Sequence, residues 1–135
     1  MTATVAPFFI GLMSGTSLDG VDGVLVDFSG TQPCVLAHHA MPFAPALKQE
    51  LLALNTPSDN ELHRAALAAN GLVRVYAQTV QALLADTQTA VSDVCAIGAH
   101  GQTVRHQPGA FDGTGYTLQL NNPALLAELT GIDVV

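Results

Sequence analysis

The chain has 135 residues, 49% of them hydrophobic and 11% charged, which suits one domain with a sizeable core and argues against disorder. Its formal net charge of −7, with only four Lys and Arg residues, argues against nucleic acid and anionic membranes as partners. A nucleotide remains possible, because backbone amides and magnesium can bind its phosphates. The N-terminus lacks a signal peptide's basic flank and no apolar run reaches membrane-spanning length, so we expect a soluble, cytoplasmic protein.

Three apolar runs predict consecutive antiparallel strands at the start of the chain. The first run covers Phe8 to Met13, and the second, Val21 to Phe28, is its hairpin partner. Turn-forming residues from Ser29 to Pro33 lead to a third strand, Cys34 to Met41. The chain therefore opens as a β-meander.

Two helices are predicted next. Pro45 suits the first turn of a helix over Ala46 to Leu54. Ser58 and Glu61 form the pattern of a capping box, which predicts the start of a long amphipathic helix reaching about Thr87. Its apolar positions recur every three or four residues and are Leu62, Ala66, Ala69, Val73, Tyr76, Val80 and Leu83. A stripe with so many alanines favours a helix lying flat on a sheet, although a coiled-coil seam has similar spacing.

Shorter elements complete the chain. Val94 to Val104 is an apolar run that we expect to pair with Tyr116 to Leu120 as a hairpin beyond the main sheet. Asn122 is a plausible N-cap for a helix over Pro123 to Leu129, and Ile132 to Val135 begins another strand. The order βββααβ(β)αβ is that of a half-molecule in the actin-like superfamily. A chain that stops on a strand is expected to be a piece of a longer protein.

The loop between the first two strands carries more chemistry than a turn requires. Glycines let backbone N–H groups approach an anion closely, and hydroxyls add side-chain donors. The polar side chains at this bend are Ser14, Thr16, Ser17, Asp19 and Asp22. We interpret the loop as a phosphate receptor in which Asp19 and Asp22 could hold magnesium. The alternative is an ordinary hairpin turn, since Gly, Ser and Asp are also common turn formers.

A second polar cluster follows a buried strand. His100, Gln102 and Thr103 come directly after the apolar residues that end at Ala99. Ligands of α/β sheets bind beyond the carboxyl ends of strands, and amide and hydroxyl groups suit sugar hydroxyls. The alternative is a hydrogen-bonded structural histidine and a loop glutamine. We expect Arg105 to be a solvated edge residue.

Other site types have little support. The five histidines lack zinc-ligand spacing, and Cys34 and Cys95 lie far apart within apolar runs, which favours free, buried, reduced thiols. A Ser-His-Asp hydrolase would need Ser14 or Ser17 as nucleophile, but neither serine lies in a Gly-x-Ser-x-Gly elbow. Walker and Gly-x-Gly-x-x-Gly motifs are absent from the sequence.

The string Met-Ser-Gly-Thr-Ser-Leu-Asp-Gly-Val-Asp, from Met13 to Asp22, closely resembles the opening signature of the anhydro-N-acetylmuramic acid kinases. Gly98 to Thr103 and Asn122 to Ile132 extend the resemblance in the same order. The resemblance implies an α/β domain of the actin-like ATPase (ribonuclease H-like) fold, with helices packed on a mixed sheet that opens with three antiparallel strands. Residues 1–135 would be the N-terminal domain of a two-domain kinase, truncated and without its second domain.

The same resemblance implies an activity and its participants. Such kinases use ATP, Mg²⁺ and water to open the anhydro sugar and phosphorylate it to N-acetylmuramic acid 6-phosphate in cell-wall recycling, commonly as homodimers. Position by position, the nucleotide-binding residues would be Gly15, Thr16, Ser17, Leu18, Asp19, Gly20, Val21 and Asp22, with magnesium ordered by the two aspartates. The residues on the sugar side would be His100, Gln102 and Thr103.

The family's general base is an aspartate in an Asp-Phe-Arg segment, and this sequence contains no such segment. Asp133 falls before the corresponding position. We therefore expect no catalytic residue in this chain and no turnover by the chain alone. The alternatives are another actin-like sugar or acid kinase and a non-catalytic module that only binds nucleotide.

Overall fold

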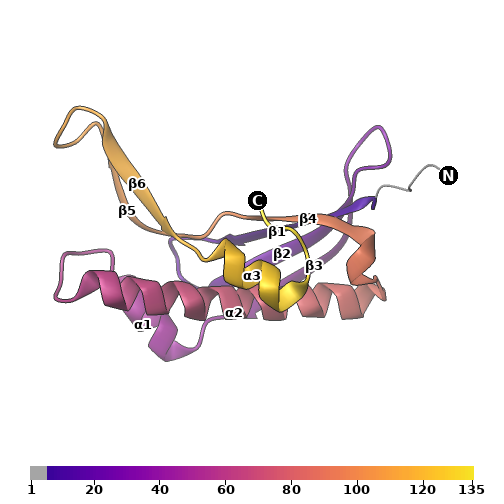
Figure 1. The fold of residues 1–135 in the computed structure, drawn as a ribbon, viewed down its shortest axis with the longest axis horizontal. Coiled ribbons are helices and arrows are strands. Elements are labelled where there is room, and N and C mark those ends of the chain that lie inside the picture. The colour runs from indigo at the N-terminus through magenta and orange to yellow at the C-terminus, as the bar shows by residue number, and fades with distance from the viewer. Residues whose placement is uncertain (1–5) are drawn as a thin grey trace.

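The computed structural model describes residues 6–135 and is built on one four-stranded mixed sheet (Figure 1). Its strands, in the spatial order β3-β2-β1-β4, are β1 (Phe8–Ser14), β2 (Gly20–Asp27), β3 (Cys34–Pro42) and β4 (Val94–Ala99). The first three strands pair antiparallel, which confirms the predicted β-meander, and β4 runs parallel to β1. The architecture is a mixed α/β fold, compatible with an actin-like ATPase domain.

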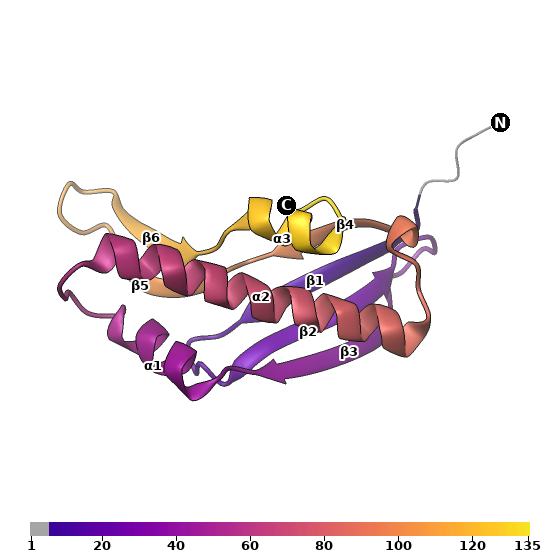
Figure 2. The same cartoon turned by 60° about the horizontal axis from the view of Figure 1, so that its bottom comes forward.

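The helices lie on one side of this sheet (Figure 2). They are α1 (Pro45–Ala53), α2 (Glu61–Thr87) and α3 (Pro123–Thr130), with a short 3₁₀ turn η1 (Val91–Asp93) before β4. The core is formed where α2 meets alternate residues of the strands; its most buried members include Ile10, Leu25, Leu72, Tyr76, Leu83 and Ile97. No helix among residues 6–135 is both long and apolar enough to cross a membrane.

The chain leaves the main sheet after β4 and forms a separate hairpin. This second sheet pairs β5 (Gln102–Pro108) with β6 (Gly115–Leu120) and projects beyond the main sheet, as predicted (Figure 1). The apolar run is interrupted at Gly101, which has φ +82°, and a Cβ there would lie 2.5 Å from the carbonyl oxygen of Leu120. The predicted C-terminal strand is reduced to a single parallel bridge between Val134 and Ile97.

The start of α2 differs from the prediction. The capping box is wrong: the N-cap is Asn60, in the left-handed region at φ 57°, and no side chain caps the helix. Ser58 Oγ accepts a hydrogen bond from Arg64 Nη1 at 2.7 Å, and Glu61 forms an ion pair with Arg105. Both side chains of the expected box are thus bound by arginines, which present charged donors and compete with the backbone amides.

The buried stripe of α2 is confirmed from Ala69 onward. Its predicted members that are buried are Ala69, Val73, Tyr76, Val80 and Leu83. Leu62 is 91% exposed and Ala66 is also exposed, so the first two predicted positions are wrong. The reason is geometric, because the first turns of α2 extend beyond the main sheet and lie below the β5–β6 hairpin (Figure 1).

Arg105 fastens that hairpin to the helices. Its side chain is only 17% exposed, so the expectation of a solvated edge residue is wrong. Besides its ion pair with Glu61, it donates a hydrogen bond from Nε to the carbonyl oxygen of Leu54 at 3.1 Å. The guanidinium therefore joins β5 to the residue after α1 and to the first turn of α2.

Both cysteines are free thiols, as predicted, but they are exposed, so the predicted burial is wrong. Cys34 is the first residue of the edge strand β3. Cys95 falls at the register shift where Phe8 pairs with Val94 and Phe9 pairs with Ala96. An apolar run therefore does not place these thiols in the core, because strand ends and bulges turn side chains outward.

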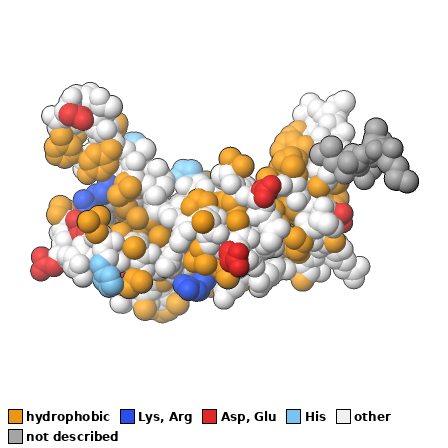
Figure 3. All heavy atoms as spheres, in the orientation of Figure 1, with side chains coloured by type: hydrophobic (Ala, Val, Ile, Leu, Met, Phe, Trp, Pro, Cys, Tyr) orange, Lys and Arg blue, Asp and Glu red, His pale blue; other side chains and the backbone are white. Residues whose placement is uncertain are grey.

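The sheet face opposite the helices is uncovered in residues 6–135. It forms an apolar hollow of about 570 Å³, lined by Phe9, Ile10, Gly11, Val24, Val26, Phe28 and Gly98. Figure 3 shows hydrophobic side chains gathered beside the β2–β3 connection. The cross-strand pair Gly11 and Gly98 leaves the middle of this face without side chains. We call this surface the open face.

Candidate functional site

The β1–β2 loop is a tight bend anchored by a buried leucine. The backbone N–H of Leu18 donates to the carbonyl oxygen of Gly15 at 3.1 Å. Leu18 has φ 56° and a side chain that is 3% exposed, so it holds the loop against the core. Gly15, Thr16 and Ser17 are exposed, and within residues 6–135 the backbone N–H groups of Thr16 and Ser17 have no protein acceptor. These amides are free to bind an anion.

The remaining members of the predicted nucleotide string separate into surface and core. Asp19 and Asp22 are exposed, whereas the side chains of Leu18 and Val21 belong to the hydrophobic core. The two buried residues can therefore offer a ligand only their backbone. The contiguous string thus contains residues that anchor the loop in the core, Leu18 and Val21, and residues that are free to contact a ligand, Asp19 and Asp22.

The two aspartates border one surface depression of about 280 Å³, which Gly20 and the end of β3 complete. Asp19 Oδ1 lies 3.8 Å from Lys48 Nζ, and Asp22 Oδ1 lies 2.9 Å from His38 Nε2. In the described part of the chain, no three His, Cys, Asp or Glu side chains converge as a metal site. Two carboxylates fit a magnesium ion that takes its other ligands from phosphate and water.

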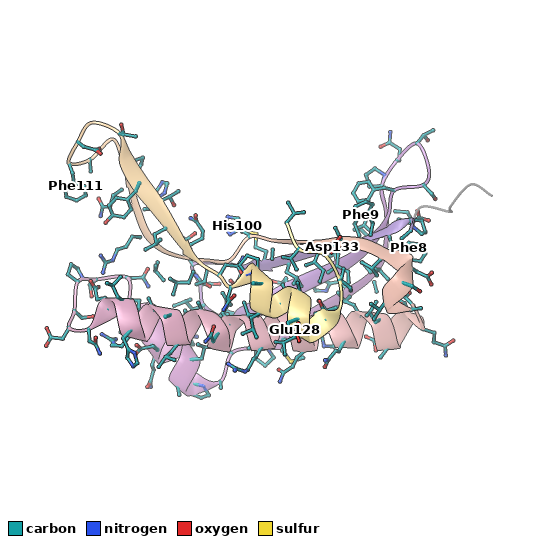
Figure 4. The ribbon with its side chains drawn as sticks, in the orientation of Figure 1. Phe8, Phe9, His100, Phe111, Glu128 and Asp133 are labelled. Carbon is teal, nitrogen blue, oxygen red and sulfur yellow. The ribbon has the colours of Figure 1, made fainter. Side chains whose placement is uncertain are left out.

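His100 lies at the carboxyl end of β4 and opens toward a hollow of about 540 Å³ (Figure 4). Asp22, Met13 and the C-terminal Val135 border the same hollow. The backbone N–H of His100 donates to Leu12, and its ring Nδ1 lies 3.0 Å from the carbonyl oxygen of Gly101. A carbonyl only accepts, so Nδ1 carries the proton and Nε2 of the neutral ring is left as an acceptor.

Gln102 and Thr103 hold other segments in place. Gln102 is 1% exposed, and its Nε2 donates to the carbonyl oxygens of Gly15 at 3.2 Å and Thr103 at 3.3 Å. Its Oε1 is buried and has no hydrogen-bond partner among residues 6–135. Thr103 Oγ1 accepts a hydrogen bond from Gln119 Nε2 at 3.1 Å, across the β5–β6 hairpin. Of the three predicted sugar-side residues, His100 is the one that borders the hollow.

The sequence analysis named Ser14 and Tyr76 but missed the contact between them. Ser14 Oγ lies 3.3 Å from the hydroxyl of Tyr76 and 3.4 Å from the carbonyl oxygen of Gly101. Ser14 is 3% exposed and Tyr76 0% exposed, so this contact is shielded from water. The sequence did contain a signal for this contact, because a tyrosine in an apolar helical stripe is buried and its hydroxyl then requires a hydrogen-bond partner.

Burial of Tyr76 predicts a loss of stability in base. Desolvation raises the pKa of Tyr76 above 10.0, outweighing the opposing hydrogen bonds with Ser14 and Gly101. The stabilising contribution is complete below about pH 10 and is lost as the pH rises toward the folded-state pKa, because the unfolded phenol ionises first. When the pH is raised from about 9 to 11, the free energy of unfolding should therefore fall less in Tyr76→Phe than in the wild type.

Urea unfolding at several pH values measures this difference. Tyr116→Phe, at an exposed tyrosine, is the matched control and should keep the wild-type dependence on pH. Parallel curves for wild type and Tyr76→Phe would contradict the prediction.

Comparisons with known proteins show the family of the chain. A family model described as anhydro-N-acetylmuramic acid kinase matches residues 7–135. Curated proteins of that name are similar to the chain: 69% identity over 94% of it in Variovorax paradoxus, 71% over 97% in Albidiferax ferrireducens and 63% over 94% in Bordetella pertussis. The chain spans 34%, 34% and 32% of these relatives, about a third of their length. By both sequence and family match, the chain belongs to the anhydro-N-acetylmuramic acid kinase family.

Proposed function

We propose that the full-length protein containing this chain is an ATP-dependent kinase. It opens the anhydro ring of anhydro-N-acetylmuramic acid with water and phosphorylates the sugar to N-acetylmuramic acid 6-phosphate, in peptidoglycan recycling. The family match supports the reaction class. The observation that carries the proposal is the hollow bordered by both Asp22 and His100, because it brings the predicted phosphate and sugar segments together.

The proposal includes the architecture of the whole protein. Residues 1–135 would be the N-terminal domain of a two-domain kinase with the ribonuclease H-like, actin-like fold. This kinase would be cytoplasmic and homodimeric. The strand order β3-β2-β1-β4 and the parallel bridge of Val134 beside β4 support the fold in this proposal. Its ligands would be ATP, Mg²⁺ and the anhydro sugar, and neither nucleic acid nor a membrane takes part.

The nucleotide side of the site is built from the β1–β2 loop. The backbone N–H groups of Gly15, Thr16 and Ser17 bind phosphate oxygens, while Leu18, Gly20 and Val21 shape the loop around them. Asp19 and Asp22 hold magnesium together with the phosphates, and a bound magnesium ion neutralises negative charge on the transferring group. Exposed amides and carboxylates at one bend support these roles.

The sugar side is built from the turn after β4. His100 accepts a hydrogen bond from a sugar hydroxyl through Nε2, and Thr103 completes this side. The predicted sugar contact of Gln102 is replaced by a positioning role, because its side chain is buried and its amide binds Gly15. The general base lies in a segment that this chain does not contain, and Asp133 is not that base. We therefore expect the chain by itself to catalyse no turnover, since water activation and closure around the substrates both need the rest of the protein.

Phosphorylation assays on the full-length protein test this function. With ATP and Mg²⁺, we expect a 6-phosphate product from the anhydro sugar, which can be followed by ³¹P NMR, and none from ordinary hexoses. Equal turnover of hexoses would favour another actin-like sugar kinase. Binding of ATP without product, in the presence of the anhydro sugar, would favour a non-catalytic nucleotide-binding module.

A further inference from the structure

We infer that Ser14, Tyr76 and Gln102 form a buried latch that fixes the phosphate loop relative to the turn after β4. They are positioning residues, which act through the backbone and not by touching the substrates. This inference rests on the proposed function, because it assigns the two segments to ATP and to the sugar. It concerns how the β1–β2 loop and the turn after β4 are held in fixed positions relative to each other.

Two hydrogen bonds cross between these segments in opposite directions. Ser14 Oγ, at the start of the loop, donates to the carbonyl oxygen of Gly101. Gln102 Nε2, from the other segment, donates to the carbonyl oxygen of Gly15. Each bond joins residues 87 positions apart in the sequence. Each segment thus supplies a donor for a backbone carbonyl of the other, which restrains both their separation and their relative rotation.

Helix α2 contacts the donor of the first bond. A carbonyl oxygen only accepts, so Ser14 donates to Gly101, and the hydroxyl of Tyr76 lies 3.3 Å from Ser14 Oγ. The resulting chain runs from Tyr76 through Ser14 to Gly101. Because Tyr76 is fully buried on α2, the latch is anchored in the hydrophobic core.

The latch orients the groups that are proposed to meet ligands. In a trans peptide the C=O and the following N–H point in opposite directions. Drawing the carbonyl of Gly15 toward buried Gln102 therefore turns the N–H of Thr16 toward the exposed side of the loop. On the other segment, the carbonyl of Gly101 that Ser14 binds also accepts from the ring of His100. One set of contacts thus orients a phosphate donor and a sugar-side side chain.

Stability alone does not account for glutamine at this position. Its Oε1 is buried without a partner in the described part of the chain, and an unsatisfied buried acceptor costs free energy. An apolar side chain of equal length would avoid that cost and would still fill the space. What glutamine adds is the donor directed at Gly15, and this donor serves the loop.

Gln102→Met in the full-length protein separates positioning from stability. The substitution keeps the length of the side chain and removes both the donor to Gly15 and the unsatisfied Oε1. We expect the KM for ATP to rise about fivefold to tenfold, the equivalent of one hydrogen bond, with little change in the urea midpoint. Ser14→Ala should shift KM and kcat in the same directions as Gln102→Met does. The combined effect in the double variant should be smaller than the sum of the two single effects.

Thr79→Val is the matched control. Thr79 is fully buried on α2, like Tyr76, and its hydroxyl donates to the carbonyl oxygen of Val75 within the helix. This variant should leave KM for ATP and kcat unchanged. If Thr79→Val shifts KM as much as Gln102→Met does, the effect is general to the core and the latch is overturned.

The remaining outcomes separate this inference from the proposed function. If the wild type phosphorylates the anhydro sugar and Gln102→Met keeps its KM and kcat, the latch is wrong and the function stands. If the wild type binds ATP without turnover, the same variants are compared by their dissociation constants for ATP, so weakened binding supports the latch although the function fails. If neither Gln102→Met nor Ser14→Ala folds, the contacts are structural and the inference falls.

Discussion

Asp19→Ala in the full-length protein should lower the phosphorylation rate about a hundredfold or more, the usual cost of removing a group that stabilises transferring phosphate. Its effect on stability should be below about 0.5 kcal/mol. The Asp19 side chain is 82% exposed and forms a surface ion pair with Lys48 at 3.8 Å. A large kinetic loss with a small folding loss would identify the carboxylate as a magnesium partner. Steady-state rates and urea unfolding, measured on the same preparation, check both values.

Asp86→Ala is the matched control for Asp19→Ala. Asp86 is another exposed carboxylate, 3.5 Å from the ring of His39, but it lies on α2 outside the β1–β2 loop. Its removal should leave the rate unchanged. Raising the Mg²⁺ concentration should restore part of the rate of Asp19→Ala and none of any loss caused by Asp86→Ala. A wild-type rate in Asp19→Ala would show that this aspartate has no part in catalysis.

Gly20→Ala should destabilise the fold by about 3 kcal/mol, because the new methyl group would overlap the backbone. Gly20 has φ +155°, and a Cβ there would lie 2.1 Å from the carbonyl oxygen of Met41 and 2.8 Å from Cα of Pro42. Neither atom belongs to a flexible side chain, so β2 and β3 would have to separate where the β1–β2 loop ends. Denaturant unfolding measures the loss directly.

Gly30→Ala provides the comparison for Gly20→Ala. Gly30 lies in the β2–β3 connection, and a Cβ there would meet only the carbonyl oxygen of Gln32 at 3.6 Å, an ordinary contact. This substitution should leave stability within about 1 kcal/mol of the wild type or raise it slightly, because alanine restricts the unfolded chain. Similar losses in both variants would mean that close backbone packing at Gly20 is not the cause.

Local patterns predicted most of the fold. Strands β1 and β2 alternate buried and more open positions, and Asn122 caps α3 through its side chain, accepting from the N–H of Leu125. These features depend on residues within a few positions of one another. The first turns of α2 were mispredicted because distant Arg105 binds Glu61, and a capping pattern contains no information about a partner 44 positions away.

The same distinction applies to the candidate site. The β1–β2 loop is a contiguous string, so its polar residues could be singled out without knowledge of the fold. The contacts that hold it come from Tyr76 and Gln102, on elements far away in the sequence. The hydrogen bonds of Gln102 depend on the path that the chain takes from the main sheet into β5 at Gly101. The spacing of apolar residues in the sequence contains no information about that path.

The open face makes the molecule strongly two-sided. The helices cover one side of the sheet, and the other side carries a broad hydrophobic surface that includes Phe9, Val24 and Phe28 and adjoins the hollow bordered by Asp22 and His100. Removing such a surface from water gains about 25 cal/mol for each Å². Adsorption of the isolated polypeptide to hydrophobic resins, to detergent micelles or to another molecule of itself is therefore favourable in free energy. The fraction that self-associates will rise with protein concentration.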